Sequence, residues 1–495
     1  MIVEAYPSKL DLDTLRFASQ VCKAWRNIIL SSSSIWALLV NLDFFTVKTE
    51  PWLLEVLRRT GESPLHIEFR DPHNPLAATF LQRLLYDNWH RVELLSLALP
   101  DKNTFDVNLK DLLRTCAPLF REFRLHLTDD PDESMDLSKD VVDFGNYAPV
   151  MHSFDASSLK VQPTSSWISN LRVWAFTIDF PLPHLVEILS NMPQLEDLSI
   201  TSPRRKCIQH TPFTRSTFPV PLPRLRMIRI VATARDWIQY VALLEYIQPE
   251  PGYYLEVEAG SLELIPSTCD MAQLAEIMRT YLGGFKEDAS RDAIHLRCPG
   301  DYRFNIWSHE FSLTLKFNAI DFHSDTIVIL KSFFYNTLYW KHVTEFGLNL
   351  CGSAQSRIDS TLPTFIWSHL NPVTRLRING CHTLRYISEC PTIFNNSLPL
   401  FPQIKTLLVL FGVNDPGSLH FINDFLQYRI DIGRPIRTLV VYGIVVPDIS
   451  LTSLDRFTGL KVVIETHSNS YSETVVEYVC GSGNPEVLAL PRNIS

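Results

Sequence analysis

The cysteine and histidine residues that lie closest together in the sequence are the first candidates for chemistry. They are Cys381 with His382, and Cys207 with His210. A protein metal site needs three or four converging ligands, and neither pair has a second pair at the usual spacing. We therefore interpret them as buried thiols beside surface histidines and predict no metal site.

A run of acidic residues is the second candidate, because carboxylates bind calcium. Residues 129–136 contain five carboxylates in eight positions. An EF-hand loop needs ligands at alternate positions and a glycine at the sixth, where this run has Ser134. We interpret the run as a solvated loop.

The motifs of the common enzyme classes are missing from the sequence. It contains no H-E-x-x-H and no G-x-S-x-G, and the Gly481-Ser482-Gly483 stretch lacks the strand-to-helix setting of a nucleophile elbow. Glycine accounts for only 17 of 495 residues, about half its usual share, and neither the dinucleotide-binding nor the P-loop glycine pattern occurs. We predict a chain that is not an enzyme and binds no cofactor.

Charge and cysteine usage restrict the partners and the compartment. The net charge is −9, and the densest basic cluster is residues 204–206, so nucleic acid is not an expected partner. No uncharged apolar segment reaches 18 residues, so we expect no membrane partner either. Nine scattered cysteines without a C-x-x-C motif suit reduced thiols. The sequence favours a cytoplasmic or nuclear protein.

The N-terminal region predicts one amphipathic helix and a second apolar element. Leu15, Ala18, Val21, Trp25 and Ile28 follow three-and-four spacing, which is typical of one apolar helix face. Serines at 31–34 end this helix, and Ile35 with Trp36 begins the next element. Taken from the residues alone, the pattern indicates a helical hairpin that covers the end of a larger domain.

The same segment contains a motif known from one family. The residues Val21-Cys22-Lys23-Ala24-Trp25-Arg26, followed by Ile35-Trp36, resemble the second half of an F-box. The L-P-x-E opening of the F-box does not occur in residues 1–9, so the resemblance implies a helical module over residues 1–45 with most of its first helix missing. In this family the F-box binds a Skp-type adaptor protein. The residues that the resemblance assigns to adaptor docking are Leu12, Leu15, Val21, Cys22, Trp25, Ile35 and Trp36.

The remaining residues alternate between helix-like and strand-like segments. A helix over 52–61, opened by Pro51 and closed by Gly61, precedes a strand over 64–69. Mid-strand positions recur at 67, 95, 125, 153, 173, 198 and 228. The spacing between successive positions is close to the repeat length of leucine-rich repeats. We therefore predict an α/β chain in which residues 46–495 form a curved, degenerate leucine-rich-repeat-like solenoid. The alternation also fits an ordinary α/β domain with right-handed crossovers.

The whole pattern is similar to the large F-box protein families of mushroom-forming fungi. This resemblance implies a substrate-receptor subunit of a cullin-RING ubiquitin ligase, which would dock the adaptor through residues 10–42 and an unknown protein substrate through the repeats. The alternative is a protein-interaction scaffold in which the partial F-box is only an N-terminal cap and no ligase is bound.

Overall fold

The structure is a computed structural model that divides into two compact units. The first unit contains residues 1–232 and 243–250, and the second contains residues 233–242 and 251–495. The residues that the structure describes are 12–38, 40–43, 50–70, 75–99, 107–127, 141–156, 159–176, 182–201, 220–232, 243–249, 254–262, 293–298, 303–308, 311–317, 343–350, 370–379, 383–384, 401–410, 418–442, 451–468 and 471–488.

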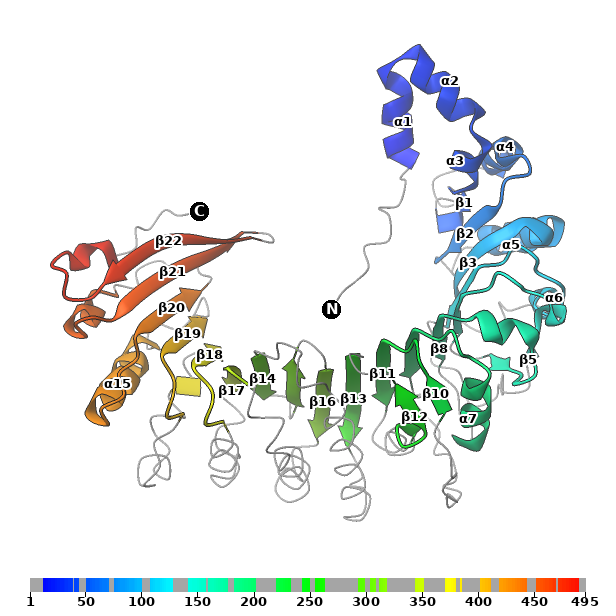
Figure 1. The fold of residues 1–495 in the computed structure, drawn as a ribbon. Helices are drawn as coiled ribbons and strands as arrows, with labels where there is room; N and C mark the ends of the chain where they lie inside the picture. Colours follow the sequence, from blue (N-terminus) through cyan, green and yellow to red (C-terminus); the bar gives the residue numbers. More distant parts are fainter. Residues whose placement is uncertain are drawn as a thin grey trace. The chain divides into compact units, whose positions relative to one another are not determined.

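The first unit begins with three short helices, labelled in Figure 1. They are α1 (Leu12–Val21), α2 (Lys23–Ser31) and α3 (Ser33–Ala37). The single helix predicted up to Ser31 is therefore two helices, because Cys22 has an extended backbone with φ −157° and ψ 167°. The Cys22 thiol accepts a hydrogen bond from the Trp25 amide at 3.5 Å, so a cysteine takes the N-cap place that serine or aspartate usually fills.

A parallel sheet forms the body of the first unit, and its neighbouring strands follow one another along the chain. Its strands are β1 (Val40–Asn41), β2 (Leu65–Phe69), β3 (Val92–Leu99), β4 (Glu122–Leu127), β6 (Ser153–Ala156), β8 (Val173–Phe176), β9 (Asp197–Thr201) and β11 (Met227–Ala232). Along β2, Leu65, Ile67 and Phe69 are fully buried, while His66 and Glu68 are half-buried. Because buried and half-buried side chains alternate along the strand, one face of the sheet packs in the core.

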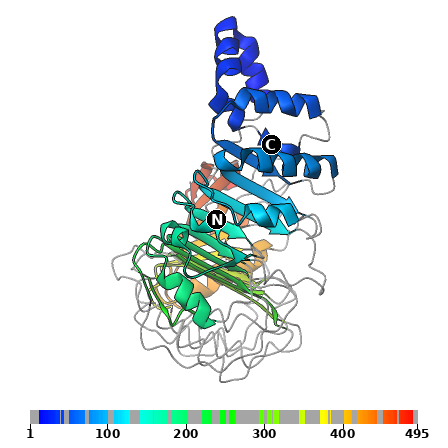
Figure 2. The same cartoon turned by 90° about the vertical axis from the view of Figure 1, so that its right-hand side faces the viewer.

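Helices cross between successive strands of the first unit. They are α4 (Glu50–Thr60), α5 (Pro75–Asn88), α6 (Val107–Leu112) and α7 (Leu182–Ser190), with short 3₁₀ turns at η2 (Trp89–Arg91), η4 (Phe144–Asn146) and η5 (Ser166–Asn170). Figures 1 and 2 show α4 and α5 on the same side of β2 and β3. Two small parallel pairs lie beside the main sheet, β5 (Val141–Val142) with β7 (Lys160–Val161), and β10 (Val220–Leu222) with β12 (Ile247–Pro249).

The second unit contains a mixed sheet. Its elements are β13 (Tyr254–Leu262), β14 (Ala293–Cys298), β15 (Arg303–Ser308), β16 (Phe311–Phe317), β17 (Glu345–Leu350), β18 (Arg375–Asn379), β19 (Thr406–Leu410), α15 (Ser418–Asp431), β20 (Thr438–Tyr442), η6 (Leu451–Arg456), β21 (Lys461–Ser468), β22 (Tyr471–Val479) and η7 (Pro485–Leu488). Strands β14, β15 and β16 form an antiparallel meander, and β13 pairs with β16 rather than with β14. From β14 through β17 to β21 the pairs are parallel, and β22 returns antiparallel to β21.

The predicted architecture, a short helical F-box-like module followed by a curved leucine-rich-repeat-like solenoid, is wrong. The described residues form an α/β fold in which a large, mainly parallel sheet dominates and helices are few. The antiparallel meander β14–β16 also breaks the one-parallel-strand-per-repeat pattern that the prediction required. Alternation of helix and strand in a sequence is common to both architectures, which is why it misled the prediction.

The sequence also predicts helices over 238–247, 271–282 and 327–339, and these ranges lie largely or wholly outside the described residues. In the part of the chain that the structure describes, none of the helices combines the length and the apolar character needed to cross a lipid bilayer.

Candidate functional site

Clusters of metal-ligating side chains are not found in the described part of the chain. No three His, Cys, Asp or Glu residues converge there in a way that could hold a metal ion. The pairs Cys207 with His210 and Cys381 with His382, and the acidic run 129–136, lie outside the described residues. The other candidate residues of the sequence lie in the N-terminal helices.

The inner side of these helices is a small apolar cluster. Leu15 from α1 and Ile29 from α2 are buried, at 8% and 6% exposure, and Ala18, Ile35 and Trp36 pack against them. This cluster holds α1, α2 and α3 together, because each of the three helices contributes to it.

Trp36 links this cluster to the next helix. Its indole N–H donates to the Ile29 carbonyl at 2.8 Å, and the Arg59 guanidinium of α4 lies 4.7 Å from the centre of its ring. A cation over an indole face is attracted by the negative charge of the ring face. The Ser63 hydroxyl also donates to the Ser33 hydroxyl at 2.8 Å. Helix α3 is thus fixed to the body of the first unit.

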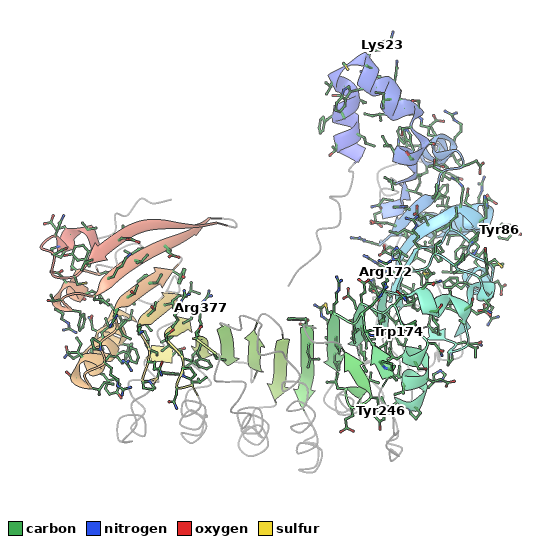
Figure 3. The ribbon with its side chains drawn as sticks, viewed as in Figure 1. Lys23, Tyr86, Arg172, Trp174, Tyr246 and Arg377 are labelled. Carbon is green, nitrogen blue, oxygen red and sulfur yellow. The ribbon has the colours of Figure 1, made fainter. Side chains whose placement is uncertain are left out.

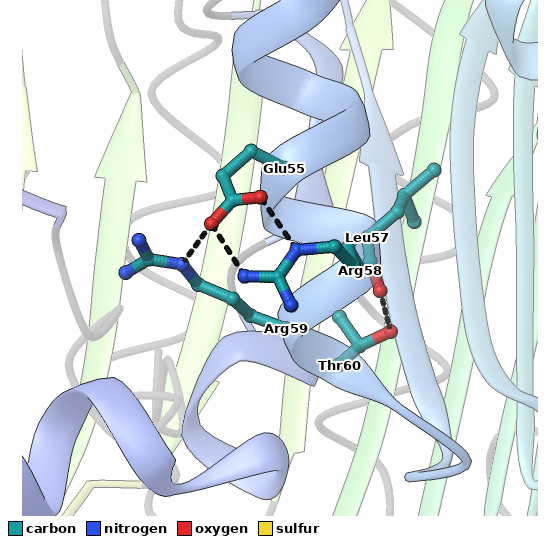
Figure 4. Close-up of polar contacts among 5 residues, drawn as sticks. All are labelled: Glu55, Leu57, Arg58, Arg59 and Thr60. Atoms are coloured by element: carbon teal, nitrogen blue, oxygen red, sulfur yellow. Dashed lines mark hydrogen bonds and ion pairs between the residues drawn. The ribbon is translucent and has the colours of Figure 1, made fainter.

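Glu55 positions the Arg59 side chain. Figure 4 shows its carboxylate between two arginines of the same helix, with Arg58 Nε at 2.7 Å and Arg59 Nε at 2.8 Å. These hydrogen bonds from Arg58 and Arg59 lower the pKa of Glu55 to about 2. Helix α4 ends directly after them, at Gly61, whose φ of 51° suits a glycine at the C′ position.

Helices α1 and α2 expose four large apolar side chains that are more than half accessible. We define the outer helical surface as Phe17 and Val21 of α1 with Trp25 and Ile28 of α2, and their side chains are 59%, 71%, 55% and 62% exposed. Spacings of four and three residues put each pair on one face of its helix. Lys23, labelled in Figure 3, and Arg26 are exposed beside it, and Arg26 Nε donates to the Ser19 carbonyl at 3.1 Å.

The structure sorts the predicted docking residues into two groups. Leu15, Ile35 and Trp36 belong to the inner cluster, whereas Val21, Cys22 and Trp25 are exposed. Leu12 lies in α1, and its side chain is outside the described part of the structure.

Sequence reasoning did not identify the exposed Phe17, and it placed Ile28 only in the apolar stripe. The spacing of four between Phe17 and Val21 is the signal that could have identified Phe17. Four large apolar side chains this exposed on two adjacent helices are unusual for a surface that contacts only water. Such a surface can bind an apolar groove on another protein, with Lys23 and Arg26 at its rim.

No protein-family model matches the chain, and no curated protein matches it.

Proposed function

We propose that this chain is a non-enzymatic substrate-receptor subunit of a cullin-RING ubiquitin ligase, and that it docks a Skp-type adaptor through the outer helical surface. The observation that supports the proposal is the exposure of Val21, Trp25 and Ile28 on the helices that carry the F-box-like motif. A protein substrate would bind elsewhere on the chain, which would then hold it near the ligase by effective concentration rather than by local catalysis.

The energetics favour a protein partner for this surface. Burying a large apolar side chain contributes about 1.5–3 kcal/mol, and interface residues that dominate binding are enriched in tryptophan. Trp25 lies between Val21 and Ile28 in the sequence and is half exposed, so it is the expected centre of the interface. The proposal includes the cytoplasm or nucleus as the compartment, and no nucleic acid or membrane as a partner.

Binding of the purified full-length chain to a Skp-type adaptor by isothermal titration calorimetry tests the proposal. We expect Trp25→Ala to weaken the affinity at least tenfold, because it removes the largest side chain of the outer helical surface. Tyr86→Ala is the matched control, since Tyr86 of α5 is an aromatic residue outside this surface that is more exposed than Trp25, at 77% against 55%. Equal affinities of the wild type and Trp25→Ala, or no binding by either, would contradict the proposal.

A second function is favoured by the inner cluster. The contacts of Trp36 with Ile29 and Arg59 support this alternative, in which the N-terminal helices would be a cap that stabilises a scaffold and no ligase would be bound. A cap predicts that Trp36→Ala lowers the melting temperature while no variant affects adaptor binding. Docking predicts that Trp25→Ala weakens adaptor binding at least tenfold at an unchanged melting temperature, so the two functions are separable.

A further inference from the structure

Three consecutive residues of the first unit have a left-handed backbone. They are Phe144, Gly145 and Asn146 in η4, with φ of 48°, 56° and 55°. Glycine adopts this conformation freely and asparagine tolerates it, but it is costly for phenylalanine. A turn of this kind persists only where its surroundings determine it, and such strain concentrates at functional sites.

The surroundings of the turn fix it firmly. The Phe144 ring is fully buried among Phe120, Phe123, Phe154 and Trp167, with ring centroids 5.3–6.4 Å away. The Gly145 amide donates to the Asp143 carboxylate at 3.0 Å, and the Ser166 amide and hydroxyl donate to the Asn146 side-chain and backbone oxygens. The turn is therefore a rigid part of the unit.

The next residue, Tyr147, is presented at the surface by this turn. Its backbone is held on both sides, since its amide donates to the Phe144 carbonyl and its carbonyl accepts from the Ala117 amide, each at 3.0 Å. Its side chain is nevertheless 54% exposed. A rigid backbone below an exposed aromatic ring has little ordering entropy left to lose on binding.

Two aliphatic side chains complete an exposed patch with Tyr147. The His152 amide donates to the Arg121 carbonyl at 2.9 Å, which puts the starts of β4 and β6 side by side. Leu119 and Val150 each lie two residues before these positions, in the turns that precede β4 and β6, and each is 41% exposed. We call Leu119, Tyr147 and Val150 the Tyr147 patch.

Positive charge adjoins the Tyr147 patch. Arg121, His152 and Arg172 immediately precede the neighbouring strands β4, β6 and β8, and Arg172 is labelled in Figure 3. Both arginine side chains are 58% exposed, whereas the carboxylates paired with them, Glu93 and Glu196, are only 19% and 28% exposed. Burial and the two flanking arginines lower the pKa of His152. A lowered pKa favours the neutral form of His152, so the cations that this edge presents to solvent are the Arg121 and Arg172 guanidinium groups, in a chain whose net charge is −9.

We propose that the Tyr147 patch docks a segment of a partner protein in which an apolar anchor side chain is flanked by acidic residues. The apolar anchor packs on Tyr147, Leu119 and Val150, and the acidic flanks pair with Arg121 and Arg172. The charge complementarity makes this occupant the favoured one. The proposal does not depend on the function proposed above, because it uses none of the residues of the outer helical surface.

A random peptide library displayed on phage, selected against the full-length chain and counter-selected against Tyr147→Ser, tests the proposal. Peptides retained by the wild type alone are expected to carry a large apolar residue between aspartates or glutamates. The most enriched peptide, synthesised with a fluorescent label, gives dissociation constants by anisotropy. We expect Tyr147→Ser, Val150→Ser and Arg172→Glu each to weaken its affinity at least tenfold, and 500 mM salt to weaken it further.

The matched control is Tyr86→Ser, which replaces a more exposed tyrosine and should leave the affinity unchanged. Melting temperatures of the variants equal to that of the wild type show that each variant is folded. The proposal is overturned if no peptide distinguishes the wild type from Tyr147→Ser, if the retained peptides are basic or lack an apolar residue, or if Trp25→Ala abolishes binding and Tyr147→Ser does not.

Discussion

Trp25 and Trp36 belong to the same sequence motif but have opposite environments. Trp36 donates its indole N–H to the Ile29 carbonyl and lies under Arg59, whereas Trp25 is 55% exposed. The three-and-four periodicity predicted one continuous stripe that would treat Val21 and Trp25 like Leu15. The stripe is interrupted at Cys22, where neither glycine nor proline marks a break in the sequence. Periodicity could therefore predict helices here, but not which side is exposed.

Cysteine reactivity gives a residue-scale prediction. Burial, with the nearby Asp455 carboxylate, raises the pKa of the Cys480 thiol to about 11, and the side chain is 1% exposed. The thiolate is the reactive form, so at pH 8 we expect iodoacetamide to modify Cys480 at least ~100-fold more slowly than the exposed Cys22 and Cys116. Peptide mass spectrometry over time measures these rates. Equal rates in the native chain would contradict the described burial, and equal rates in guanidinium are the control.

At the scale of elements, the sequence predicted the helices and strands that have a strong local signal. The strand predicted around position 95 is β3 (Val92–Leu99), and the helix predicted over 52–61 is α4, ended by Gly61. The meander strand β15 and the edge strand β22 were missed, because no repeat phrase marks them. The left-handed turn at Phe144 could not be predicted, since it depends on the aromatic rings packed around it.

Helix α4 supplies a prediction about pH. The pKa of Glu55 is about 2 because Arg58 and Arg59 donate to its carboxylate. A folded-state pKa below the unfolded one means that the interaction stabilises the helix above about pH 4.5, and that this is lost as the pH falls toward 2. In NMR spectra of chain labelled at glutamate, we expect the Glu55 carboxyl signal to stay constant from pH 7 to 3.5.

The double variant Arg58→Met with Arg59→Met is the control for this titration. Its Glu55 signal should titrate near pH 4–4.5, as for an ordinary glutamate. If Glu55 titrates at that pH in the wild type as well, the arginine contacts do not exist in solution.

For the whole molecule, the sequence could predict the alternation of elements but not the order of strands. In the first unit the neighbouring strands follow the chain from β1 to β11, as expected for successive helix–strand segments. In the second unit, β13 pairs with β16, and β15 and β14 follow. Strand order depends on which edges meet after the chain has turned, and a repeat length contains no information about that.

Each unit contains a buried arginine that ties a helical segment to neighbouring backbone. In the first unit, Arg91 donates to the Thr60 hydroxyl at 3.1 Å and to the Ser63 carbonyl at 2.9 Å. In the second, Arg429 of α15 is 1% exposed and donates to the carbonyls of Phe401, Ile404 and Arg434 at 3.0–3.3 Å. Burial lowers the pKa of Arg429 to about 10, so the guanidinium is still charged at pH 7.

Arg429→Met should therefore destabilise the second unit. It removes the guanidinium donor from three backbone carbonyls, two of them in buried contacts, which costs roughly 2–4 kcal/mol. Hydrogen–deuterium exchange should show lost protection in the peptides that cover β19, α15 and β20, since these elements adjoin the removed guanidinium. Arg437→Met, at an exposed arginine of the same unit, is the matched control and should leave protection unchanged. Equal protection in both variants would mean that the Arg429 hydrogen bonds contribute nothing to stability, and that apolar packing of α15 alone holds it on the sheet.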